Sequence, residues 1–180
     1  MEAMKCVKER RSIRRFEPKD VPAETVVGLV EAARYAPSWK NSQTVRYIAL
    51  TGDVKDRVAR EGVMGFGWNT AIIQGAPVLM LLTTVDGVSG YEKSGEPATS
   101  KGSHWQSFDA GLSAEAFCLA AHDAGLVTVI LGIYDDEAVR RLASVPEGQS
   151  VSALIALGWP ADAPAAPARR DVSELLSWRA

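Results

Sequence analysis

The chain has 180 residues, with 20 Lys and Arg against 22 Asp and Glu, so its formal net charge is -2. Apolar residues make up 47% and charged residues 23%, a composition that is ordinary for a globular protein and excludes general disorder or a collagen-like fibre. The longest apolar run, Ala76–Leu82, is far shorter than the ~20 residues of a membrane-spanning helix, and the start of the chain lacks the apolar stretch of a signal peptide. We therefore expect one domain over residues 1–180, in the cytoplasm, without a membrane or a nucleic acid as partner.

Helical and strand patterns alternate along the chain. The patterns predict, in order, helices at 4–9 and 23–35, a strand at 46–51, helices at 53–62 and 68–75, a strand at 77–84, an irregular Gly- and Ser-rich loop at 86–104, a helix at 105–124, a strand at 126–131, a helix at 135–143 and a strand at 151–157. A short amphipathic tail ends the chain. Because the strands are nearly continuous apolar runs, we expect helices to cover both faces of the sheet.

Four arginines and a serine stand close together near the N-terminus, in the segment RRSIRRF at residues 10–16. Arginine has a planar set of donors that can grip a phosphate with two hydrogen bonds, and it stays charged at any working pH. A serine hydroxyl beside these arginines adds a small donor. The segment therefore fits a phosphate site, while a solvated basic end of a helix explains the charge equally simply.

A second segment, APSWKNSQ at residues 36–43, follows the end of a predicted helix and is dense in uncharged hydrogen-bonding side chains. Asn and Gln each offer a donor and an acceptor, which suits the edge of a planar heterocycle. An ordinary polar turn is the alternative interpretation.

Two further features have weaker signals. The strand at 126–131 ends at Gly132, and a glycine there allows a ligand to approach the backbone, although a core strand with a turn glycine is the simpler interpretation. Arg169 and Arg170 follow a Pro- and Ala-rich segment and, taken alone, form a surface charge pair. Cys6 and Cys118 have no neighbours at zinc-ligand spacing and are expected to be free thiols. With no metal cluster and no nucleophile motif, an enzyme of this kind would take its chemistry from an organic cofactor.

Taken together and in order, RRSIRRF, APSWKNSQ, AHDAGLVTVILGIYD and GWP with PAAPARRDVSELL resemble segments of the nitroreductase family of FMN-dependent oxidoreductases. The resemblance extends from about residue 8 to residue 178. It implies an α+β fold, namely a three-layer helix–sheet–helix sandwich with a mixed sheet. It also implies an intertwined homodimer with one FMN at each end of the interface.

The resemblance also implies the residues that bind the cofactor. It assigns the phosphate and ribityl region to Arg10, Arg11, Ser12, Arg14, Arg169 and Arg170. It lines the flavin with Pro37, Ser38, Asn41 and Gln43, some of them from the partner chain. It places the backbone of Leu131 and Gly132 against the ring, with an N–H directed at N5, and Asn69 is a further candidate. The chain departs from the family pattern at Thr44-Val45 and Ile130, and it has only the 86–104 loop where longer members carry a helical excursion.

The implied activity is transfer of hydride from NADH or NADPH, through flavin N5, to a nitroaromatic, a quinone or a similar small-molecule acceptor in ping-pong order. The flavin carries this chemistry, so no side chain is assigned as catalytic and no metal is expected. The first alternative is a flavin protein of the same fold with other chemistry, such as dehalogenation or flavin consumption, or without nitroreductase turnover. The second is a protein that binds nucleic acid or lipid through residues 10–15, against which the net charge argues.

Overall fold

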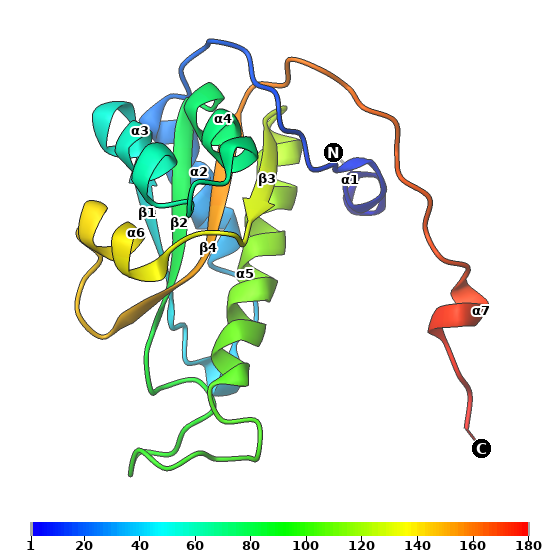
Figure 1. The fold of residues 1–180 in the computed structure, drawn as a ribbon. Coiled ribbons are helices and arrows are strands. Elements are labelled where there is room, and N and C mark those ends of the chain that lie inside the picture. Colours follow the sequence, from blue (N-terminus) through cyan, green and yellow to red (C-terminus); the bar gives the residue numbers. More distant parts are fainter. Residues whose placement is uncertain (1, 180) are drawn as a thin grey trace.

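The computed structural model describes residues 2–179 (Figure 1). Its elements in chain order are α1 (Ala3–Glu9), α2 (Ala23–Ala33), the short 3₁₀ helix η1 (Trp39–Asn41), β1 (Val45–Leu50), α3 (Gly52–Glu61), α4 (Gly67–Gly75), β2 (Val78–Val85), α5 (His104–Asp123), β3 (Val127–Leu131), α6 (Asp136–Leu142), β4 (Gln149–Gly158) and α7 (Val172–Leu175). Each strand and long helix lies within about two residues of the range that the apolar pattern predicts. The element that the pattern does not predict is η1.

The sheet has the strand order β1-β2-β4-β3, and every neighbouring pair of strands is antiparallel. The expectation of a mixed sheet is therefore wrong for the four strands. The parallel pairing that the structure does contain is an isolated bridge between Ser12 and Thr128, at the outer edge of β3. An apolar run shows that a strand is buried but not which way it points. The helices α3 and α4 follow β1 in the chain and pack against each other. They leave the chain at the end of the sheet where β1 finished, so β2 runs antiparallel to β1.

Helices cover both faces of this sheet, as predicted (Figure 1). On β2 the side chains alternate, because successive residues of a strand point to opposite faces. Leu79 and Leu81 join one buried cluster with residues of α3, α4 and α6, whereas Met80 and Leu82 join a second cluster with α2 and α5. The α+β helix–sheet–helix sandwich is thus confirmed.

Two segments at the ends of the chain run together along the top of the molecule as drawn in Figure 1. Phe16 forms a bridge with Pro160, and the N–H of Ala161 donates to the carbonyl of Arg15 at 3.1 Å. Gly158 permits this close approach, because a Cβ there would lie 2.9 Å from Cδ1 of Phe16 and 2.6 Å from Cδ of Pro77. From this point residues 163–179, which we call the C-terminal arm, leave the body of the molecule and are exposed throughout.

None of the helices within residues 2–179 combines the length and the apolar character that crossing a bilayer requires.

Candidate functional site

The arginine segment is held in place by β3. The N–H of Ile13 donates to the carbonyl of Thr128 at 3.0 Å, and the side chain of Ile13 is buried, with 4% of its surface exposed. In extended backbone successive side chains point to opposite sides, so burial of Ile13 turns Ser12 and Arg14 outward. Both of these residues are exposed.

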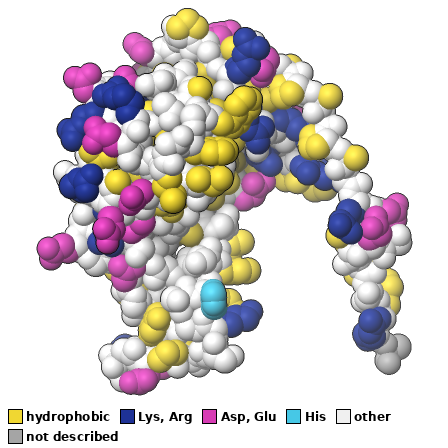
Figure 2. Space-filling view, in the orientation of Figure 1, with side chains coloured by type: hydrophobic (Ala, Val, Ile, Leu, Met, Phe, Trp, Pro, Cys, Tyr) yellow, Lys and Arg dark blue, Asp and Glu magenta, His cyan; other side chains and the backbone are white. Residues whose placement is uncertain are grey.

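Ser12 and Arg14 face a cavity of about 360 Å³, which we call the arginine cavity. Its polar lining comes from both ends of the chain: Arg10, Arg11, Ser12, Arg14 and Arg169. Pro164, Ala165 and Pro167 of the C-terminal arm complete it. The structure therefore brings five of the predicted phosphate-region residues to one place, although Arg169 is more than 150 positions from the other four. Figure 2 shows basic side chains gathered where the arm leaves the body.

The protein balances only part of the charge of this cavity, through an ion pair between Arg10 and Glu115. Nε of Arg10 is buried without a hydrogen-bond partner, and the nearest carboxylate oxygen, on Glu115, lies 3.5 Å away. Within residues 2–179 no carboxylate forms an ion pair with Arg11, Arg14 or Arg169. Guanidinium groups that lie together without counterions are the donor set that a phosphate group requires. By contrast, Arg170 pairs with Glu174 at 3.3 Å and does not line the cavity.

A second cavity, of about 570 Å³, adjoins the first and shares Ser12, Arg14 and Pro164 with it. We call it the adjoining cavity. Its walls are largely apolar, and they include Phe16, Trp68, Ala71 and Ile72. One oxygen of Asp162, which also lines it, is buried without a partner. A mostly apolar cavity with a few polar groups next to a cationic one suits a ligand that has a planar ring and an anionic tail.

The end of β3 lies outside both of these cavities. Leu131 is buried in the core, with 6% of its surface exposed, whereas Gly132 is exposed. A Cβ placed on Gly132 would meet no other atom of this chain within 4 Å, so the internal packing does not demand a glycine there. Asn69, which is 5% exposed, donates from Nδ2 to the carbonyl of Ile133 at 3.0 Å and fixes the backbone that follows.

Residues 36–43, which we call the polar loop, lie elsewhere on the chain. None of Pro37, Ser38, Asn41 and Gln43 lines the arginine cavity. Instead Ser38 and Gln43 line a groove of about 460 Å³ between α2 and β1. The loop is unusual in two ways. Three of its residues with side chains have positive φ, namely Lys40, Asn41 and Gln43, and buried polar atoms of Trp39, Ser42 and the adjacent Thr44 have no hydrogen-bond partner.

The titratable groups with shifted pKa values offer no activated acid, base or nucleophile. Burial raises the pKa of the Cys118 thiol, and desolvation likewise raises that of Cys6, so neither is a thiolate at neutral pH. Burial raises the pKa of Tyr47 and of Tyr134 to about 12. No three His, Cys, Asp or Glu side chains of residues 2–179 gather closely enough to hold a metal ion. The strongest chemical feature of these residues is thus a place for an anionic ligand.

Comparison with known proteins identifies the family and the fold. The model of the nitroreductase family matches residues 7–65 and 65–159. A Methanothermobacter thermautotrophicus protein, named as an NADH dehydrogenase/NAD(P)H nitroreductase, is 28% identical over 171 residues, which cover 91% of this chain and 80% of that protein.

Two solved structures have the same fold. A nitroreductase family protein from Streptococcus pneumoniae superposes with a TM-score of 0.86 at 21% identity and covers 98% of this chain and 99% of its own. A nitroreductase from Desulfovibrio desulfuricans, solved in complex with FMN, superposes with a TM-score of 0.76 at 26% identity over 100% of this chain and 98% of its own.

Proposed function

Because the chain belongs to the nitroreductase family, we propose that it is an NAD(P)H-dependent oxidoreductase that binds FMN and passes electrons to a nitroaromatic, a quinone or a similar small acceptor. The observation that carries this proposal is the arginine cavity, which Arg10, Arg11, Arg14 and Arg169 line and in which only Arg10 has a carboxylate partner among the described residues. The FMN complex of the related structure supports the choice of cofactor, and the names of the relatives support a nicotinamide as electron donor.

The residues of the arginine cavity fit the phosphate of FMN. A phosphate monoester carries a charge of about -1.5 to -2 at neutral pH, and several guanidinium groups can meet it with charge-assisted hydrogen bonds. Nε of Arg10 is buried and lies 3.5 Å from Glu115 without a hydrogen bond, so it offers a donor for the phosphate. Ser12 offers a hydroxyl in the same cavity.

The adjoining cavity fits a ring better than a phosphate. Phe16, Trp68 and Ile72 give it an apolar wall that can pack against a planar group and exclude water. Arg14 lines both cavities, so its positive charge can favour negative charge on a ring that lies beside it. When bound, FMN supplies hydride acceptance at N5 and onward electron transfer, and the side chains serve to bind, orient and screen it.

We further propose that two chains form an intertwined homodimer. The C-terminal arm exposes Leu175, Leu176 and Trp178 to solvent, at 69%, 50% and 84% of their surface, which is costly for an isolated chain. The groove between α2 and β1 is apolar inside and has Arg34 and Arg46 among its lining, and β1 is an edge strand of the sheet. An arm of the partner seated there would cover both exposed surfaces, and the polar loop of one chain could then face the cavities of the other.

Steady-state kinetics test the proposed activity. The FMN-loaded protein should oxidise NADH or NADPH in the presence of a nitroaromatic or a quinone, and reciprocal plots at several acceptor concentrations should give parallel lines, as a ping-pong order requires. A loaded protein that oxidises neither nicotinamide in an acceptor-dependent way would overturn the assignment.

A further inference from the structure

Asp109, on α5, is a carboxylate that is almost wholly buried, with 1% of its surface exposed. Both of its oxygens accept a hydrogen bond from the backbone N–H of Trp39, at 3.0 and 3.1 Å. Its Oδ2 also accepts from the hydroxyl of Ser89, at 2.7 Å, and that serine is fully buried. A carboxylate is tolerated in the interior only where such donors replace its lost hydration. Asp109 thus joins three separate segments: α5, the polar loop and residues 86–103, which we call the excursion loop.

The polar loop needs such an anchor. Lys40, Asn41 and Gln43 have φ angles of 45°, 55° and 49°. Residues with a Cβ rarely adopt this left-handed backbone and keep it only where their surroundings determine it. Three hydrogen bonds close the loop on itself: the N–H groups of Asn41 and Ser42 donate to the carbonyls of Ser38 and Trp39 at 3.0 and 2.7 Å, and the N–H of Gln43 donates to Oγ of Ser38 at 3.0 Å. The bonds from Trp39 to Asp109 attach the loop to α5.

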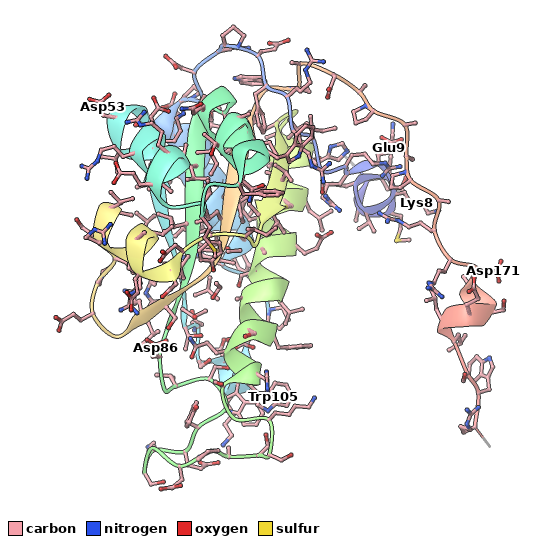
Figure 3. All side chains as sticks on the ribbon, in the orientation of Figure 1. Lys8, Glu9, Asp53, Asp86, Trp105 and Asp171 are labelled. Atoms are coloured by element: carbon pink, nitrogen blue, oxygen red, sulfur yellow. The ribbon has the colours of Figure 1, made fainter. Side chains whose placement is uncertain are left out.

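The excursion loop is also connected to the polar loop in two other ways, through Trp105 and through an ion pair. The indole rings of Trp39 and Trp105 lie 4.6 Å apart between centroids, and Nε1 of Trp105 donates to Oγ1 of Thr99 in the excursion loop at 2.9 Å. Lys40 forms an exposed ion pair with Glu92 at 3.0 Å. Figure 3 shows Trp105 at the start of α5, beside the excursion loop. The two loops therefore share one support, and the carboxylate of Asp109 is its buried centre.

We propose that Asp109 is a positioning residue that couples the excursion loop to the polar loop and so fixes the side chains of Ser38, Asn41 and Gln43 for contact with the flavin. The contact with the flavin rests on the proposed function, whereas the coupling of the two loops does not. Asp109 itself touches neither cofactor nor substrate in this arrangement. Loops in general vary in sequence more than core strands do, so a change in the excursion loop can then alter the flavin site without touching it.

The test compares Asp109→Ala with a matched control, Asp135→Ala. Asp135 caps α6, on the opposite face of the sheet, through a bond from the N–H of Ala138 at 3.0 Å, so its loss also removes a carboxylate that accepts a backbone N–H. Three readouts are taken. The first is the circular-dichroism couplet of the Trp39–Trp105 pair, which is assigned by its loss in Trp105→Phe. The second is the rate of proteolytic cleavage within residues 86–103. Both are measured on FMN-free protein. The third is the dissociation constant of FMN.

Asp109→Ala should lose the indole couplet, speed cleavage of the excursion loop and weaken FMN binding about tenfold, because the freed polar loop must then be ordered when FMN binds. Asp109→Asn keeps a carbonyl oxygen for the N–H of Trp39 and should recover most of each signal. Asp135→Ala should lose stability but keep all three signals.

An Asp109→Ala protein that behaves like Asp135→Ala in all three readouts overturns the proposal. If the parent protein itself does not bind FMN, the proposed function fails, and the indole couplet and the cleavage rate still decide whether the loops are coupled. Should Asp109→Ala not fold, Ser89→Ala removes one donor only, and an unchanged cleavage rate in that variant would equally refute the coupling.

Discussion

At the scale of single residues, Arg14 is the side chain on which the proposed site depends most, because it lines both the arginine cavity and the adjoining cavity. Among residues 2–179 its guanidinium makes one long contact, 3.4 Å to the carbonyl of Ser12, which leaves its other donors for a ligand. Ile13, buried beside β3, holds the backbone that presents it.

Arg14→Ala should weaken FMN binding roughly 10- to 150-fold, since a hydrogen bond to a charged group contributes about 1.5–3 kcal/mol. The measurement is a fluorescence titration of FMN with the flavin-free protein. Arg57→Ala is the control, because Arg57 is an exposed arginine on α3 whose partner is Glu61. Equal FMN affinity in the two variants would remove Arg14 from the site.

At the scale of elements, the end of α4 depends on a buried lysine. Lys55 of α3 is 5% exposed, and its Nζ donates to the carbonyls of Ile73 and Gln74 at 3.0 and 3.3 Å. The last carbonyls of a helix lack hydrogen-bond partners within the helix and lie at the negative end of its dipole. A cation placed there donates hydrogen bonds to these carbonyls and interacts favourably with the dipole. Asp56, at 2.7 Å, balances the charge.

Lys55→Met keeps the aliphatic stem but removes these bonds, and it should lower the free energy of unfolding by about 1.5–3 kcal/mol. Urea denaturation of the flavin-free protein measures this loss without a contribution from ligand binding. Lys93→Met, at an exposed lysine of the excursion loop, should leave the midpoint unchanged. If both variants unfold at the same urea concentration as the parent, Lys55 does not stabilise α4.

The elements also show how far the sequence can predict this fold. The apolar runs of β2 and β4 and the helical spacing on α2 and α5 carry their own signals, so these elements are predicted to within a few residues. The direction of the strands is not predicted, because an apolar run looks the same in either direction and the number of connecting helices does not fix it: β1 and β2 are antiparallel with two helices between them, and β3 and β4 with one. Nor is η1, because its backbone is left-handed at Lys40 and Asn41, which have side chains, and is held by Asp109 from 70 positions away.

The residues of the candidate site likewise fall into those that the sequence predicts and those that it does not. The arginines at 10–14 form a local pattern that can be recognised, and the arginine cavity does bring them to Arg169. Arg170, also predicted, pairs with Glu174 instead. Trp68 and Asp162 line the adjoining cavity but carry no sequence signal, because their proximity to Arg14 exists only in the folded chain. One feature of the sequence could have pointed to Asp109, namely an acidic residue within a predicted helix that is rich in alanine and apolar residues.

At the scale of the whole molecule, the predicted arginines and the predicted residues of the polar loop lie in two places that a single chain does not bring together. The arginine cavity lies where the two ends of the chain meet, whereas the polar loop packs against the start of α5 (Figure 1). The exposed C-terminal arm offers a way to unite them, because it can reach a second copy of the chain. The homodimer is therefore part of the proposed function and not an addition to it.

Truncation after Arg170 removes the exposed apolar residues Val172, Leu175, Leu176 and Trp178 of the arm but keeps Arg169. We expect the full chain to have the mass of a dimer in light scattering after gel filtration, and the truncated chain to dissociate at concentrations where the full chain does not. FMN binding should weaken as the truncated dimer dissociates, although every arginine of the cavity remains. A truncated chain that stays dimeric at the same concentrations would show that the arm does not hold the two copies together.

The most direct test of the central claim, that the arginine cavity and its surroundings hold FMN, is a titration of the flavin-free protein with FMN, followed by visible absorption and by mass spectrometry of the ligand released on denaturation. The account predicts saturation at one FMN per chain, a yellow protein after gel filtration, and release of FMN and not FAD. A protein that stays colourless after incubation with excess FMN would contradict it.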